Sequence, residues 1–296
     1  MTFLKTLSLA ILFSAWLAPG IAYAQAQSKT TITVTPAQSL IPHKALYEVK
    51  MVSGKSGSQM VNIAGKMFYE WKPSCEGWIT NHRFSLNYEY ADNPSLNVTS
   101  DFSTFENFDS QMLNFSTRRK RDGEVYEELR GRAAINSAEN GAGKVVYSIP
   151  ENLSFPLDPG TLFPTAHTMK LLQQAKSGKK FFTARIFDGS DSDGAVDITA
   201  FISEKNLPPA SIAKKSEGFK PVSGGTFDQS LIAVPSWKVR MAFFPVKDKE
   251  ATSDYELSMV FHENGIIGDM VIEYADFSVS QKLIAIERIA PPNCKN

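Results

Sequence analysis

Apolar and polar residues alternate along most of the chain at a spacing of two, which is the pattern of half-buried β-strands. The runs are short, and turn dipeptides such as Asp122-Gly123 and Asn264-Gly265 separate them. Strands joined by short turns pair with their neighbours along the chain, so the pattern predicts an antiparallel meander. The predicted strands span residues 45–51, 61–69, 78–90, 96–105, 112–118, 124–134, 144–149, 181–187, 196–202, 237–244, 255–262, 268–274 and 277–288.

One segment departs from this period. Within residues 163–176 the apolar positions recur at helical spacing. Pro164 suits a first helical turn, Gly178 suits the stop, and Thr161 or Thr165 is expected to cap the N-terminus. The sequence therefore predicts one amphipathic α-helix in an otherwise all-β chain, lying across the mouth or the concave face of the sheet, where its apolar stripe is buried.

Residues 1–24 have the features of a cleaved signal peptide. Lys5 supplies the positive start, residues 7–17 form a short apolar run, and Ala22-Tyr23-Ala24 matches the small-x-small cleavage pattern. The alternative is an uncleaved anchor, but the run is shorter than the roughly 20 residues that span a bilayer. The signal predicts export, to a bacterial periplasm. After the signal, no apolar run is long enough for a transmembrane helix.

The composition narrows the function classes. The 296 residues contain 31 Lys and Arg against 31 Asp and Glu. This balance argues against a nucleic-acid binder, which normally carries a basic excess. Hydrophobic residues make up 43%, enough for a sizeable core. With four His and two Cys there is little material for a metal cluster, so we expect no metal site and no cofactor.

The predicted export affects how the two cysteines, Cys75 and Cys294, are interpreted. An oxidising compartment favours a disulfide between them, and two separate free thiols are the alternative. Such a bond would tie an early strand to the last residues and favour one domain, residues 43–296, behind a flexible leader, residues 25–42. Residues 206–224, rich in Pro, Ser and Lys, are predicted to be a long exposed loop.

The sequence contains only weak matches to motifs for metal binding, anion binding or catalysis. Residues 188–194 are rich in carboxylates but fail the spacing of an EF-hand, so a charged turn is the better interpretation. Residues 118–121 place four cations at a hairpin tip, directly before three nearby glutamates that offset them. Ser177–Lys180 and Ser211–Lys214 each satisfy S-x-x-K, without the S-D-N and K-T-G companions of peptidoglycan-acting enzymes.

Several stretches, in the order found here, resemble the EipB family of cell-envelope integrity proteins. They are IPHKALYEVKM from Ile41, GKMFYEW, SCEGW from Ser74, PGTLFPTAHTMKLL, FDGSDSDG and the closing cysteine. The resemblance implies a periplasmic protein that is not an enzyme. It also implies a β-spiral, an open and broken barrel of about fourteen antiparallel strands, with a disulfide that maps onto Cys75 and Cys294. Such a spiral is similar to the half-barrel carriers that move lipoproteins between membranes.

The sequence thus leads to three hypotheses. The first is a monomeric, non-enzymatic periplasmic protein that supports envelope integrity by binding an envelope partner. The second is a carrier or sensor of a lipid or lipoprotein acyl chain in the concave face, and the third is an envelope hydrolase. The helix either plugs the spiral permanently or moves to expose an apolar concavity. The residues expected to face a ligand or partner are Phe163, His167, Met169 and Leu172.

Overall fold

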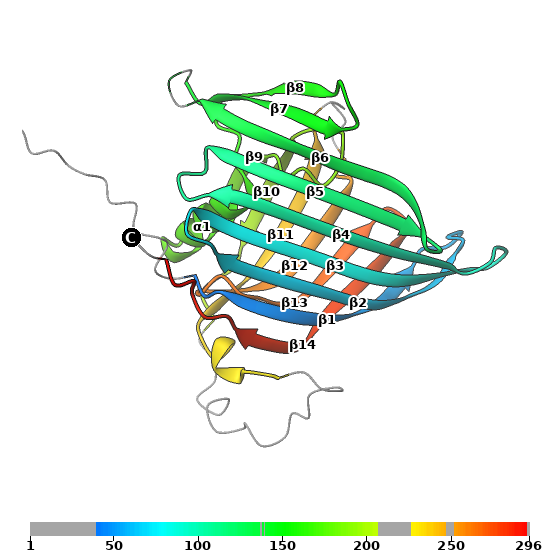
Figure 1. Cartoon of the computed structure of the whole chain (residues 1–296). Coiled ribbons are helices and arrows are strands. Elements are labelled where there is room, and N and C mark those ends of the chain that lie inside the picture. Colours follow the sequence, from blue (N-terminus) through cyan, green and yellow to red (C-terminus); the bar gives the residue numbers. More distant parts are fainter. Residues whose placement is uncertain (1–39, 137, 139, 207–225, 247–251, 295–296) are drawn as a thin grey trace, which may run out of the picture. The chain divides into compact units, whose positions relative to one another are not determined.

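The computed structural model contains a single continuous antiparallel β-sheet (Figure 1). It describes residues 40–136, 138, 140–206, 226–246 and 252–294, all within the unit Val34–Asn296. The predicted signal peptide, most of the predicted leader and nearly all of the predicted long loop lie outside the described residues.

The elements follow the predicted order closely. One α-helix, α1 (Pro164–Lys176), and one short 3-10 helix, η3 (Gln229–Leu231), accompany the strands in the described part of the chain. The strands are β1 (His43–Gly54), β2 (Met60–Pro73), β3 (Gly77–Tyr90), β4 (Leu96–Asn107), β5 (Met112–Arg121), β6 (Glu124–Asn136), β7 (Ala142–Ile149), β8 (Ser154–Leu157), β9 (Phe181–Ile186), β10 (Val196–Ile202), β11 (Ser236–Pro245), β12 (Tyr255–His262), β13 (Ile267–Tyr274) and β14 (Phe277–Arg288).

The sheet is a meander whose first and last strands meet. The strand order is β8-β7-β6-β5-β4-β3-β2-β1-β14-β13-β12-β11-β10-β9, so β1 pairs with β14 in the middle and β8 and β9 are the free edges. These edges do not pair with each other, and the barrel therefore stays open. The prediction of a mainly β, open antiparallel spiral with one helix is confirmed. Sequence reasoning missed β8, because four residues that include Pro156 show too little alternation.

Burial alternates along the strands and defines an inner face. In β1, His43, Ala45, Tyr47 and Val49 are buried, whereas the residues between them are partly exposed. The main core cluster joins β1 and β2 to β9–β14 and to α1, and a second cluster lies among β5–β8. Leu40, which falls in the predicted leader, already packs into the main cluster. The folded part therefore includes residues before His43.

The connection between β9 and β10 links the two halves of the open sheet. Its backbone carbonyls accept hydrogen bonds from inward-facing side chains of β5 and β7: Arg119 donates to Ser190 at 2.7 Å, and Tyr147 donates to Asp191 at 2.7 Å. Gly189 has φ +76°, and a Cβ there would come within 2.2 Å of the Phe115 ring. Only glycine combines this backbone conformation with so close an approach.

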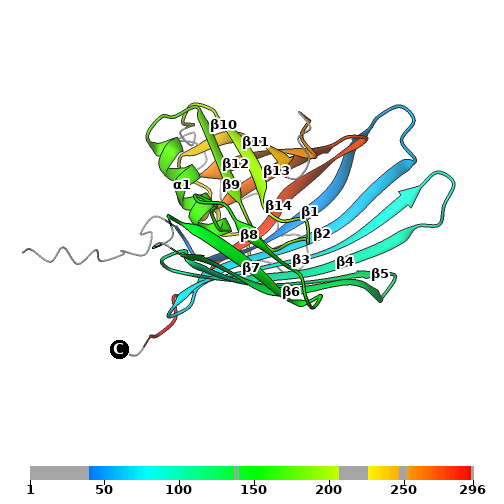
Figure 2. The same cartoon turned by 90° about the horizontal axis from the view of Figure 1, so that it is seen from above.

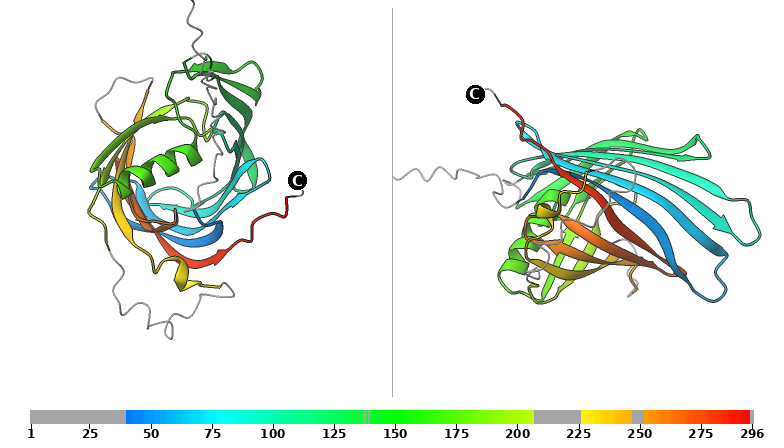
Figure 3. Two further views of the ribbon diagram at one scale, coloured as in Figure 1. Left: turned by 90° about the vertical axis from the view of Figure 1, so that its left-hand side faces the viewer. Right: turned by 90° about the horizontal axis from the view of Figure 1, so that it is seen from below.

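Helix α1 lies inside the curve of the sheet at one end, as the left view of Figure 3 shows. The hairpin turn between β1 and β2 lies at the other end (Figure 2). Pro164 at the start and Gly178 after the last turn, with φ +76°, agree with the predicted boundaries. No helix in the described part of the chain has the length and apolar character needed to cross a membrane.

Candidate functional site

The four residues expected to face a ligand are mostly part of the core. Phe163 is fully buried among β5–β8, and Leu172 packs into the main cluster. His167 is buried and stacks on Phe182, with ring centroids 5.6 Å apart. Met169 alone among the four also lines a surface groove of about 390 Å³ beside the helix. In this structure α1 is a packed plug.

A buried carboxylate from β4 holds the N-terminus of the plug. Glu106 accepts hydrogen bonds from the backbone N–H groups of Thr165 at 2.7 Å and Ala166 at 3.0 Å, and from the Ser110 hydroxyl at 2.8 Å. The prediction that Thr161 or Thr165 caps the helix is wrong, since the Ncap is Phe163 and makes no side-chain cap. Burial raises the pKa of Glu106, and the hydrogen bonds that it accepts partly oppose this shift.

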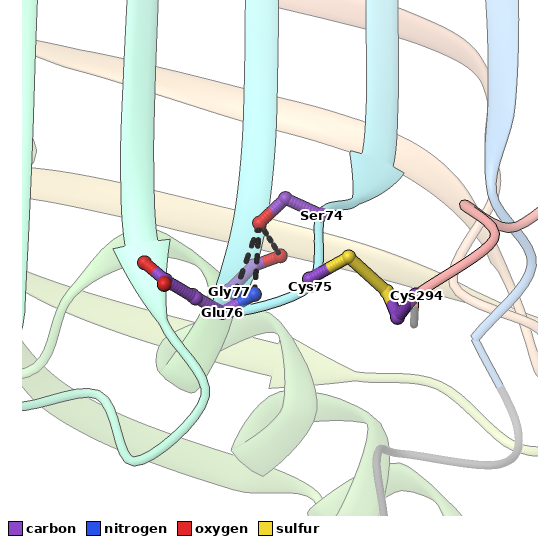
Figure 4. Close-up of a disulfide and its surroundings, with 5 residues drawn as sticks. All are labelled: Ser74, Cys75, Glu76, Gly77 and Cys294. Carbon is purple, nitrogen blue, oxygen red and sulfur yellow. Dashed lines mark hydrogen bonds between the residues drawn. A yellow bond between two sulfur atoms is a disulfide. The ribbon is translucent and has the colours of Figure 1, made fainter. Parts of the chain in front are cut away.

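The disulfide lies at the same end of the sheet as the helix. Cys75 and Cys294 are bonded, with their Cα atoms 5.6 Å apart (Figure 4). Cys75 sits in the β2–β3 turn, where the Ser74 hydroxyl oxygen accepts from the N–H of Gly77 at 3.1 Å. A Cβ on Gly77 would come within 2.2 Å of the Glu106 carbonyl oxygen, so this turn packs directly on β4. The bond fixes the C-terminal segment to the end of β2.

A second feature of the inner face is a cavity of about 350 Å³ on the side of β1, β2, β3, β13 and β14. Its wall is made by inward-facing residues: Val49, Ile63, Met67, His82, Phe84, Leu86, Tyr88, Ile272, Tyr274, Phe277, Val279 and Gln281. The strand registers place Val49 opposite both Gly65 and Gln281, and Gly65 opposite Leu86. The wall is therefore continuous across four paired strands.

The cavity is oriented along the strands. His82 lies at its inner end, beside Tyr69, with ring centroids 4.8 Å apart. Tyr88 lies six residues further along β3, roughly 20 Å away at 3.3 Å per residue. Tyr274 is 36% exposed and lies at the end of β13 next to the β13–β14 turn, so the cavity reaches the surface at the end away from the helix.

The lining of this cavity carries no charge at neutral pH. Burial lowers the pKa of His82 to about 4 and raises the pKa of Tyr88 to about 12. The other lining residues are aliphatic, aromatic, Met or Gln. A charged ligand group would lose its hydration without gaining a counter-charge, whereas an apolar chain would lose little. The arrangement therefore suits an uncharged, apolar part of a ligand.

The weaker motifs have structural roles. Ser177 lies at the C-terminus of α1, where its hydroxyl donates to the Gln174 carbonyl, and the second S-x-x-K lies outside the described residues. Arg118 and Arg119 pair with Glu128 and Glu127 across the β5–β6 hairpin. Among the described residues no group of three His, Cys, Asp or Glu side chains could hold a metal ion.

Residues 34–290 match the EipB-like family model. The chain belongs to the EipB-like family. An EipB-like relative, the cell envelope integrity protein EipB of Brucella abortus (strain 2308), is 30% identical over 251 residues, 84% of each chain. A crystal structure from Brucella abortus, a beta-barrel-like protein of a domain of unknown function (DUF1849), matches with a TM-score of 0.73 and 28% identity, covering 85% of this EipB-like chain and 99% of that one.

Sequence reasoning located the helix and the cysteines but not the cavity. The cavity residues come from positions 49 to 281 and share no local motif. The only signal was their alternation, which places Phe84, Leu86 and Tyr88 on one face of β3 without saying that this face borders a space. Whether an inward face is filled depends on which side chains meet across the sheet.

Proposed function

We propose that this protein supports the integrity of the cell envelope by binding, and that it holds an apolar chain of a lipid or lipoprotein in the concave cavity. The observation that carries the proposal is the uncharged, apolar lining of a 350 Å³ cavity that reaches the surface. A volume of this size falls within the range of ligand pockets, about 300–1,000 Å³. The relative's name and the predicted signal peptide support an envelope role and a periplasmic location.

We propose binding rather than catalysis for this protein. Among the described residues, both cysteines are bonded to each other, and His167 is buried against Phe182. His82, the histidine in the cavity, is held neutral by burial, and its ring contacts are the aromatic rings of Tyr69 and Phe102. The site therefore offers shape and apolar surface.

A matched pair of variants tests the proposal. Leu86 faces the cavity, and its neighbour Ser85 is exposed on the outer face of the same strand. Leu86→Trp should fill part of the cavity and weaken binding of the neutral probe N-phenyl-1-naphthylamine at least tenfold, whereas Ser85→Trp should leave it unchanged. Melting temperatures of both variants show that they are folded. Equal probe binding by the two folded variants would contradict the proposal.

The natural ligand can be identified directly. Native mass spectrometry of protein purified from its own periplasm should show a bound lipid that the Leu86→Trp variant lacks. The second candidate function is docking of an envelope protein, which the groove beside Met169, Lys170 and Gln173 favours. Crosslinking in cells followed by pull-down would give a protein partner, lost in Lys170→Glu, and no lipid in that case.

A further inference from the structure

The outer face of the sheet carries a second groove, on the opposite side from the cavity described above. Its volume is about 590 Å³, and it extends over β10–β14. The strand registers define one row of outward residues across it: Phe201, Arg240, Ser258, Val271 and Ser280 lie opposite one another in turn. The next row contains Lys238 opposite Val260.

The centre of the groove is apolar and its rim is cationic. Val260 and Val271 form the apolar centre, and Phe201, which is 47% exposed, borders it. Three cations line the groove, Lys238, Arg240 and Lys282, against a single acid, Asp269. The groove therefore has an excess of positive charge beside apolar surface.

The three cations differ in how far they are neutralised. Arg240 pairs with both Glu256 and Glu273. Lys282 lies opposite Glu48 on β1, but Glu48 pairs with Lys50, and Lys282 forms no ion pair among the described residues. Lys238 is exposed, lies between Ser203 and Val260, and forms no ion pair among the described residues. The uncompensated charges of the groove are thus the Lys238 and Lys282 ammonium groups, of which Lys238 lies directly opposite Val260.

We propose that this outer groove binds a fatty acid, with the carboxylate at Lys238 and the chain over Val260 and Val271. An apolar chain covers the two valines and removes them from water, while the carboxylate supplies the charge that Lys238 lacks. The volume of the groove lies in the range of small-ligand sites. The site is separate from the concave cavity and does not depend on the function proposed for it.

Nuclear magnetic resonance of the full mature chain, with labelled valine and isoleucine methyl groups, tests the site. Dodecanoate and its cationic counterpart dodecyltrimethylammonium are titrated below their micellar concentrations. Dodecanoate should shift the methyl signals of Val260 and Val271, and the cationic amphiphile should bind there at least fivefold more weakly. Val49 and Val279 report on the concave cavity in the same spectra.

Two surface variants complete the test. Lys238→Glu should weaken dodecanoate binding at Val260 and Val271 at least fivefold, because it replaces the attracting charge by a repelling one. Lys66→Glu, on the outer face of β2, is the matched control and should bind like the parent. Equal binding of the two amphiphiles, or unchanged binding by Lys238→Glu, overturns the proposal.

The outcomes for the two sites are distinguishable. Shifts at Val49 and Val279 alone would overturn the outer site and leave the concave cavity as the binding site. Shifts at Val260 and Val271 that disappear in Lys238→Glu, without any at Val49 and Val279, would support the outer site and count against acyl-chain binding in the cavity.

Discussion

Removing the Glu106 carboxylate that binds the N-terminus of α1 should lower the stability of the protein. Glu106 is 1% exposed, and its carboxylate accepts two backbone N–H groups from the first turn of the helix. Glu106→Ala removes both acceptors, and water cannot replace them without opening the core. Each buried donor left unpaired costs about 1–3 kcal/mol. Two such donors lower the expected free energy of unfolding by about 2–6 kcal/mol.

Thermal and chemical unfolding measure this loss. For a domain of this size 1 kcal/mol corresponds to about 2–4 °C, so the melting temperature should fall by about 4–24 °C. Glu76→Ala is the control, since Glu76 is an exposed glutamate in the nearby turn (Figure 4). A melting temperature of Glu106→Ala within 1 °C of that of the Glu76→Ala control would correspond to a stability difference of only about 0.25–0.5 kcal/mol. In that case Glu106 does not hold the helix and the reasoning is wrong.

Glu106→Gln separates charge from hydrogen bonding. Its amide keeps one acceptor oxygen, so it should cost less than Glu106→Ala, about 1–3 kcal/mol. In the unfolded chain the carboxyl titrates near 4.5, and burial raises its pKa in the folded protein. The folded state therefore takes up the proton first as pH falls, and wild-type stability relative to Glu106→Gln should decrease as pH rises from 4.5 through the raised pKa. A constant difference between the two proteins over pH 4–8 would contradict this assignment.

Further predictions concern the disulfide, the buried histidine and the β9–β10 connection. Cys75→Ser opens a loop with a sequence separation of 219, and the chain-entropy model gives a loss of about 5 kcal/mol; reductant should destabilise the parent but not the variant in urea unfolding. Burial lowers the pKa of His167 to about 4, so stability should fall as pH drops from 6.5 to 4, and His167→Leu should reduce that slope by up to about 1.4 kcal/mol per pH unit. Gly189→Ala should destabilise the protein by more than about 1 kcal/mol, because the added methyl strains a backbone with φ +76° and collides with Phe115. Gly123→Ala is the control: its Cβ would meet nothing within 4 Å, so it measures the backbone strain alone.

Local patterns were enough for most of the architecture. Alternation located thirteen of the fourteen strands, because one face of each strand is buried and the other is not. Pro164 and Gly178 marked the helix ends, since their backbone preferences act within a few residues. The helix N-cap was mispredicted because the acceptor, Glu106, is 59 residues away from Thr165 along the chain.

The amino-acid sequence by itself determined the strand faces, the single helix, the cysteine pair and the resemblance to an envelope protein family. Only the tertiary structure decided that β1 pairs with β14, that β8 and β9 stay apart, and that Phe163 and Leu172 fill the core. It alone showed the uncharged cavity bordered by Leu86 and Val279. The physical reason is that periodicity reports which side of a strand is apolar, whereas pairing, filling and empty space depend on side chains that meet from distant parts of the chain.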